Sequence, residues 1–172
     1  HCIENLPERH DDVLSVSIPA IAHRVLAVYW RQVRSFDGHE LIQVRGSTGR
    51  ITTATKDLRA ATNAGDGGLS LEVAMLKAPR AYAEAVDKIV IALAKQPLPR
   101  LQKLPGSAVS DTFLYEDSFL GEGVSRARLR ANGDAIVLKP GIAHGLARLA
   151  GLLKPAFEVM WVNDVRRMNK YL

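Results

Sequence analysis

The sequence predicts an α+β fold that is mainly helical, with five to six helices and a small antiparallel sheet whose hairpin resembles a wing. Apolar residues recur at spacings of three and four through most of the chain, which is the helical period. The spacing changes to two only between about residues 113 and 138. An Asn132-Gly133 pair lies in that part, and Asn-Gly is a strong hairpin signal.

The first predicted helix begins near Pro19 and ends before Ser35. Its apolar residues form a wide face, which predicts a largely buried helix. They are Ile18, Ile21, Val25, Leu26, Val28, Trp30 and Val33.

Three further helices are predicted before residue 96. The first covers about residues 50–61, and Ser47 or Thr48 is expected to cap it. After a glycine-rich loop over residues 63–68, Ser70 is expected to cap a short helix that ends near Ala78. Pro79 suits the first turn of the next helix.

The segment 96–107 contains three prolines in nine residues, so neither a helix nor a central strand is expected there. Residues 113–115 form a short strand candidate, and 124–138 is expected to form two strands joined at Asn132-Gly133. A long apolar helix follows, which Pro155 should kink or split. Its basic and apolar end lacks a stop signal, so a junction with a longer protein is expected there.

We expect a single DNA-binding-type domain over residues 13–172, with a division into 13–96 and 108–172 as the alternative. Residues 1–12 hold one arginine and four acids, which predicts a flexible acidic segment. The whole chain has a net charge of +5, so the rest is more basic and suits a polyanion such as nucleic acid. With no secretory signal, no apolar membrane segment and one cysteine, Cys2, a cytoplasmic protein without disulfides is expected.

No residue pattern predicts a catalytic site. The five histidines are scattered, acid and lysine spacings do not fit a metal-dependent nuclease, and no serine lies in a nucleophile elbow. We therefore predict no catalytic residue, no metal ligand and no cofactor in this chain, and we expect that the chain alone does not cut DNA.

The segment "RGSTGR" is the first predicted DNA contact. Its small residues precede a helix whose free N–H groups favour an anion, so Arg45, Ser47, Thr48 and Arg50 are candidates for a phosphate or base contact. An ordinary capped helix start with solvated arginines is the alternative interpretation.

The second predicted DNA contact is Arg126, Arg128 and Arg130, which alternate with small or apolar residues. On a strand they would form a row on one face and follow a phosphate backbone. Protection of an edge strand by charge is the alternative. Arg100 and Lys103 add to the basic set. Tyr29, Trp30 and Tyr115 could stack a nucleobase, with core packing as the alternative.

The chain resembles the N-terminal region of bacterial, mostly actinobacterial, HNH endonucleases of the restriction type. The resemblance covers residues 24–169, and its most specific parts are Tyr29-Trp30, "PLPRLQ" (97–102) and "RLAGLLKP" (148–155). It implies a module that reads or positions double-stranded DNA, including modified DNA, in bacterial defence. The metal-dependent nuclease would follow in the parent protein, because no position here matches its motif.

Two other functions stay open from the sequence. The chain could be a protein-interaction domain that forms a homodimer through the apolar C-terminal helix. It could also be a stand-alone enzyme, which the missing catalytic pattern disfavours.

Overall fold

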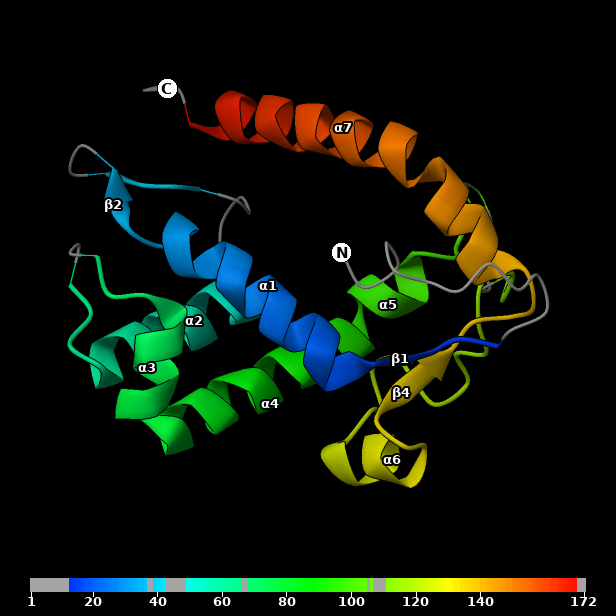
Figure 1. Cartoon of the computed structure of the whole chain (residues 1–172), viewed down its shortest axis with the longest axis horizontal. Helices are drawn as coiled ribbons and strands as arrows, with labels where there is room; N and C mark the ends of the chain where they lie inside the picture. The colour runs from blue at the N-terminus through cyan, green and yellow to red at the C-terminus, as the bar shows by residue number, and fades with distance from the viewer. Residues whose placement is uncertain are drawn as a thin grey trace. The chain divides into compact units, whose positions relative to one another are not determined.

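The computed structural model describes residues 13–36, 39–42, 49–65, 68–104, 106 and 111–169 (Figure 1). These ranges form an α+β structure that is mainly helical, as predicted. Five to six helices were expected, and seven occur in the described ranges, one of them only four residues long. The predicted acidic segment 1–12 lies outside the described residues.

The chain divides into two compact units. Unit 1 contains the chain up to Ile18 together with Ala94–Asp164, and unit 2 contains Pro19–Leu93 together with the chain from Val165. Each unit is therefore built from two separate stretches of the sequence.

Unit 2 is built around four helices that begin close to their predicted positions. They are α1 (Ile18–Gln32), α2 (Arg50–Ala61), α3 (Leu71–Lys77) and α4 (Pro79–Lys95), with the first and last extending past the unit boundary. Two short strands, β2 (Ser35–Phe36) and β3 (His39–Glu40), pair antiparallel. The buried residues include Leu26, Leu58, Leu71 and Ile89, which come from all four helices.

Two of the three predictions about how these helices begin are confirmed. The Ser70 hydroxyl accepts a hydrogen bond from the Val73 amide at 3.3 Å, so the predicted cap of α3 is confirmed. Pro79 is the first residue of α4, also as predicted. The expected capping of α2 by Ser47 or Thr48 is wrong, because Gly49 occupies the cap position without a side-chain hydrogen bond.

Side-chain hydrogen bonds fix one face of α1 inside unit 2. The Trp30 indole donates to the Leu69 carbonyl at 2.8 Å, and His23 Nδ1 lies 2.8 Å from the Tyr82 hydroxyl on α4. Ala22 and Leu26 are fully buried on the same side. The opposite face of α1 is consequently exposed.

Unit 1 combines short elements with most of the longest helix. These are β1 (Ser15–Ser17), α5 (Pro97–Arg100), α6 (Arg126–Ala131), β4 (Ala135–Val137) and α7 (Ile142–Met168), whose last residues belong to unit 2. β1 pairs antiparallel with β4, with Val16 opposite Ile136. Tyr115 adds a bridge to Leu138, so the predicted strand 113–115 is reduced to one paired residue.

The predicted hairpin over residues 124–138 is wrong, because its first half is the helix α6. Ser125 caps this helix by accepting a hydrogen bond from the Arg128 amide at 3.2 Å. Arg, Ala and Leu are strong helix formers, and the segment lacks the β-branched residues that favour strands. The turn at Asn132-Gly133 does form, but it connects α6 to β4, with Gly133 at φ +72°.

One proline prediction needs correction. Pro97 is the first residue of the one-turn helix α5, which forms because a proline there lacks only an N–H that needs no intrahelical partner. Of the two outcomes predicted at Pro155, a kink or a split, the split does not occur, since α7 runs through Pro155 as one element.

Replacing Ser125 by alanine should destabilise unit 1 by about 1 kcal/mol, because α6 is only one and a half turns long and loses its cap. Urea unfolding measures the change. Ser70→Ala is the matched variant in unit 2 and should cost a similar amount. A Ser125→Ala protein as stable as the wild type would contradict the role of this cap.

Candidate nucleic-acid interface

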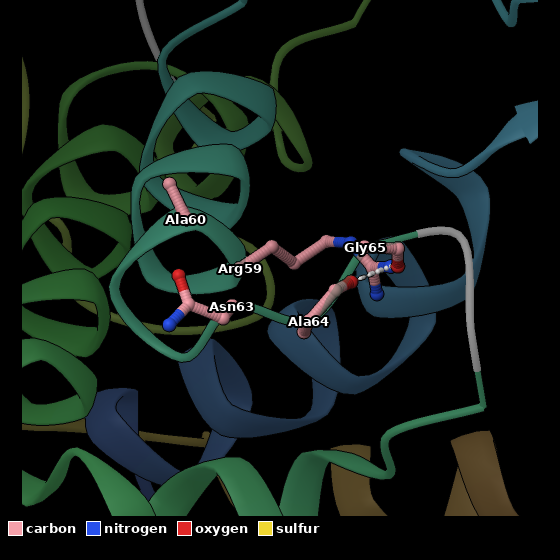
Figure 2. Close-up of a pocket in the computed structure, with 5 residues that line it drawn as sticks. All are labelled: Arg59, Ala60, Asn63, Ala64 and Gly65. Atoms are coloured by element: carbon pink, nitrogen blue, oxygen red, sulfur yellow. Dashed lines mark hydrogen bonds between the residues drawn. The ribbon is translucent and has the colours of Figure 1, made fainter.

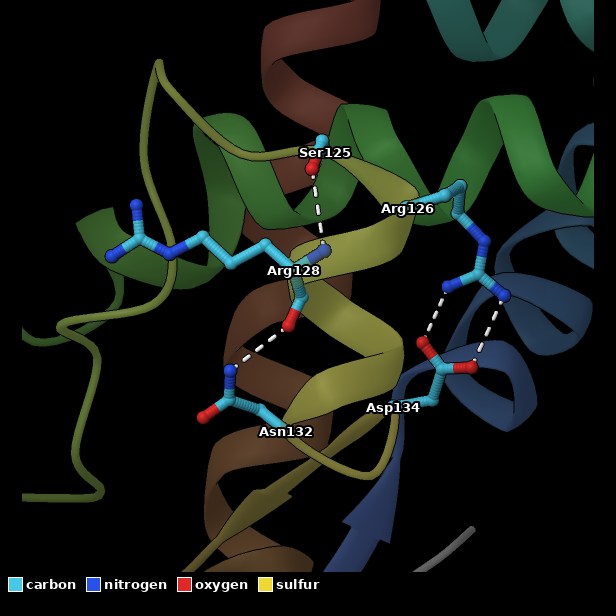
Figure 3. A network of polar contacts seen from close by, with 5 residues as sticks. All are labelled: Ser125, Arg126, Arg128, Asn132 and Asp134. Carbon is cyan, nitrogen blue, oxygen red and sulfur yellow. Dashed lines mark hydrogen bonds and ion pairs between the residues drawn. The ribbon is translucent and has the colours of Figure 1, made fainter.

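The three arginines of α6 do not form the predicted row. Figure 3 shows Arg126 and Arg128 extending from opposite sides of the helix. Arg126 forms a two-fold ion pair with Asp134, in which Nη2 lies 3.1 Å from Oδ2, and both side chains are mostly shielded from water. Arg126 is therefore engaged in holding the turn that follows α6.

Arg128 and Arg130 are exposed. Arg128 Nη2 donates to the Ser118 carbonyl at 2.6 Å, which directs this side chain along the protein surface. Because residues two apart on a helix point in different directions, the expected common face for a phosphate backbone is absent. The alternative interpretation, in which these arginines protect an edge strand, is also wrong, because the segment is a helix and not a strand.

The other predicted contacts belong to different units or lie outside the described residues. Arg45, Ser47 and Thr48 lie outside them. Arg50 is exposed as the first residue of α2 in unit 2, whereas Arg100 is exposed as the last residue of α5 in unit 1.

The aromatic residues predicted to stack a base are used in packing. Trp30 and Tyr115 are only 4% and 2% exposed, and the Tyr115 hydroxyl donates to the Leu98 carbonyl at 2.7 Å. Tyr29 is half-buried, and this burial raises the pKa of its hydroxyl. The core-packing alternative therefore describes Trp30 and Tyr115.

One face of the Trp30 ring is covered by Arg59, whose guanidinium carbon lies 4.8 Å from the ring centre. Arg59 is buried and donates to the carbonyls of Trp30, at 3.1 Å, of Ala64, at 2.5 Å, and of Gly65. Arg59 lines an open hollow of about 540 Å³ together with Ala60, Asn63, Ala64 and Gly65. These five residues are drawn in Figure 2. The guanidinium holds the α2 end in place and is committed to these carbonyls.

The exposed face of α1 is a feature that the sequence pattern did not predict. Ala20, Arg24, Val28 and Arg31 are all exposed, and their spacing of four, four and three places them on one helical face. The fifteen residues of α1 include no Asp or Glu. The absence of Asp and Glu from residues 18–32 can be read from the sequence. The period of the apolar residues, however, predicts only which face of the helix is buried.

Charge is unevenly divided between the units. The described residues of unit 2 include eleven lysines and arginines and five acids, whereas those of unit 1 include nine and seven. Two of the unit 2 cations are in exposed ion pairs, Lys56 with Glu40 at 2.6 Å and Lys88 with Asp57 at 2.8 Å. Arg24, Arg31, Arg50, Lys77 and Arg80 form no ion pair with a described residue.

Charged residues of α1 affect the pKa of one acidic residue, Glu72, on helix α3. A hydrogen bond with its own backbone and one with the Ser70 hydroxyl lower the pKa of the Glu72 carboxyl, and the charges of His23 and Arg31 lower that pKa further. Glu72 is thus an anion near Arg31 without forming a close ion pair with it.

No helix in the described part of the chain has both the length and the apolar character needed to cross a membrane. Among the described residues, no three His, Cys, Asp or Glu side chains lie close enough to share a metal ion. The search for relatives found no matching family model, no matching curated protein and no matching solved structure.

Proposed function

We propose that this chain binds double-stranded DNA and that unit 2 makes the main contact. The observation that carries the proposal is the exposed face of α1, which presents Arg24 and Arg31 on a helix without a single acid. Surface helices of ordinary soluble domains usually mix both signs of charge. Even with Glu72 near Arg31, the two arginines leave this face with a net positive charge, which attracts a polyanion and gains affinity by releasing the counterions of DNA.

Three more cations of unit 2 support this assignment. Arg50, Lys77 and Arg80 are exposed and come from three different helices. They suit contacts with phosphate oxygens, which position a protein on the duplex without reading its sequence. Unit 1 contributes less, because Arg126 is paired with Asp134 and its charges are nearly balanced.

In the parent protein, the resemblance extends the proposal to a module that positions an HNH-type nuclease on DNA, including modified DNA. Any divalent metal would then act in that nuclease. The residues of this chain would supply affinity and orientation only.

Fluorescence anisotropy with a labelled duplex at salt concentrations from roughly 50 to 200 mM tests the proposal. The logarithm of the binding constant should fall linearly with the logarithm of the salt concentration. Arg50→Ala, Lys77→Ala and Arg80→Ala should each reduce the slope by up to about 0.9 and weaken binding equally on all duplexes.

Arg130→Ala is the matched control, because Arg130 is an exposed arginine of unit 1. It should leave the slope unchanged. The proposal fails if the wild-type chain binds no duplex at the lowest salt. It also fails if Arg130→Ala reduces the slope while the unit 2 variants, still folded by circular dichroism, do not.

A second candidate function is self-association through α7. Leu149, Leu152, Ala156 and Val159 are exposed and follow the alternating spacing of three and four found where two helices pair. This seam carries no charge, so two copies of the same face would meet without like-charge repulsion. Leu152 is 75% exposed, which is costly for a leucine without a partner.

Sedimentation equilibrium measures this association. The wild type should form a dimer at micromolar concentration, and Leu152→Glu should shift it to monomer, whereas Leu76→Glu, at an even more exposed leucine of α3, should not. A monomeric wild-type chain at all concentrations tested would eliminate this candidate.

A further inference from the structure

We infer that α1 is the helix that enters the major groove and that its exposed face reads base edges there. This inference rests on the proposed binding of duplex DNA and adds which element reads the sequence. Arg24, Val28 and Arg31 lie on one face of α1, and each is exposed.

The position of these residues on the helix favours base edges over phosphates. Ala22 and Leu26 are fully buried, and Arg24 lies between them in sequence on the opposite side of the helix. Arg24 and Arg31 are seven residues apart, close to two full turns, so both extend from the middle of the exposed face. When a helix docks in a groove, the middle of its outer face meets the floor and its flanks meet the phosphates.

Small side chains beside the arginines allow close approach. Ala20 is exposed on the same face, and Ala27 is half-buried at its edge. The major groove is about 12 Å wide, which admits an α-helix. Ala20 and Ala27 therefore leave room for the backbone of α1 to approach the bases beside the two arginines.

The spacing sets the length of DNA that α1 would cover. Seven residues of helix rise by about 10.5 Å, which corresponds to about three base-pair steps. An arginine recognises guanine by donating to its O6 and N7 atoms, and an apolar side chain contacts the methyl group of thymine. The face therefore fits a short element with a guanine contact at each end and a thymine contact from Val28, which is 55% exposed between them.

The test starts from duplexes with a randomised core, selected for binding to the complete 172-residue chain. An enriched duplex is then made again with 7-deazaguanine, which lacks the N7 acceptor, or with deoxyuridine, which lacks the thymine methyl group. With 7-deazaguanine at one guanine position at a time, the wild type should bind several-fold more weakly, but by less than the roughly 5- to 160-fold for a whole bidentate contact, because the O6 acceptor remains. It should also bind the deoxyuridine duplex measurably more weakly.

Variants assign these losses to residues. Arg24→Ala and Arg31→Ala should each abolish the effect of 7-deazaguanine at one position, and Val28→Ala should abolish the effect of deoxyuridine. Arg24→Lys keeps the charge but loses the planar fork of donors. It should retain the salt dependence of binding while its preference for guanine declines. Arg80→Ala, outside α1, should keep the full base preference.

The possible results distinguish base reading by α1 from DNA binding by the chain. Salt-dependent binding without any enriched sequence, or with equal affinity for all of these duplexes, would overturn base reading by α1 and leave DNA binding intact. A base preference that survives in the Arg24→Ala, Arg31→Ala double variant would also overturn it, because another element would then read the bases. Absence of binding to every duplex would instead overturn the proposed function itself.

Discussion

Replacing Gln102 by leucine should lower the free energy of unfolding by about 3 to 5 kcal/mol, because several buried backbone groups lose their partners together. Gln102 is fully buried. Its Oε1 accepts from the amides of Leu114 and Tyr115 at 3.0 and 3.1 Å. Its Nε2 donates to the Tyr115 carbonyl at 2.9 Å and to Asp117 Oδ2 at 3.0 Å. Leucine has a similar volume but can make none of these bonds.

Urea unfolding followed by circular dichroism measures this effect. Gln96→Leu is the matched control, because Gln96 is exposed and makes one side-chain bond, to Glu122 at 2.9 Å. The Gln96→Leu substitution should change the free energy of unfolding by less than about 0.5 kcal/mol. The loss of unfolding free energy in Gln102→Glu should lie between the losses in Gln102→Leu and Gln96→Leu. Glutamate keeps both acceptor bonds but places a carboxylate beside Asp117. A Gln102→Leu protein within 1 kcal/mol of the wild type would contradict this network.

Replacing Arg59 by leucine should destabilise the chain by about 3 kcal/mol. The variant loses charge-assisted bonds to the carbonyls of Trp30, Ala64 and Gly65. It also exposes the face of the Trp30 ring that the guanidinium covers. Leucine fills part of the space without supplying any donor, so buried carbonyls remain unpaired.

Urea unfolding gives the energy. Because the chain has two tryptophans, Trp30 and Trp161, the fluorescence of Trp30 is followed with Trp161 replaced by phenylalanine, and it should shift toward that of an exposed indole. Arg50→Leu is the control on the same helix and should be nearly neutral, because Arg50 is exposed. Arg59→Lys keeps the charge but cannot reach several carbonyls at once, so we expect an intermediate loss. Equal stability of Arg59→Leu and Arg50→Leu would show that these carbonyls do not depend on Arg59.

The helices of unit 2 could be predicted because local signals agreed. α3 has both a serine cap and an apolar period, and α4 starts at a proline and has one continuous apolar stripe. A strand was predicted in place of α6 because a six-residue alternation of arginine with Ala and Leu fits a strand as well as a short helix. Only Leu129 of α6 is buried, so the burial pattern could not discriminate, whereas residue propensity could.

Long-range pairing could not be predicted from spacing alone. Nothing in residues 15–17 indicates that their partner lies at 135–137, since a three-residue segment with one apolar side chain, Val16, could pair with many others. The same limit applies to the candidate site. The acid-free face of α1 is visible in the sequence, but the pairing of Arg126 with Asp134 and the burial of Arg59 depend on the fold of the surrounding turns.

The pairing of β1 with β4 bears on the order in which the protein folds during synthesis. β1 leaves the ribosome before Pro19–Leu93 of unit 2, and Val16 meets Ile136 only after that stretch has been made. At usual elongation rates this delay is on the order of ten seconds. The Pro19–Leu93 part of unit 2 has time to collapse during the delay, whereas β1 waits with unpaired backbone groups. The nascent chain is therefore most exposed to wrong strand pairing at β1, and the pairing with β4 closes a long loop that runs from Val16 to Ile136.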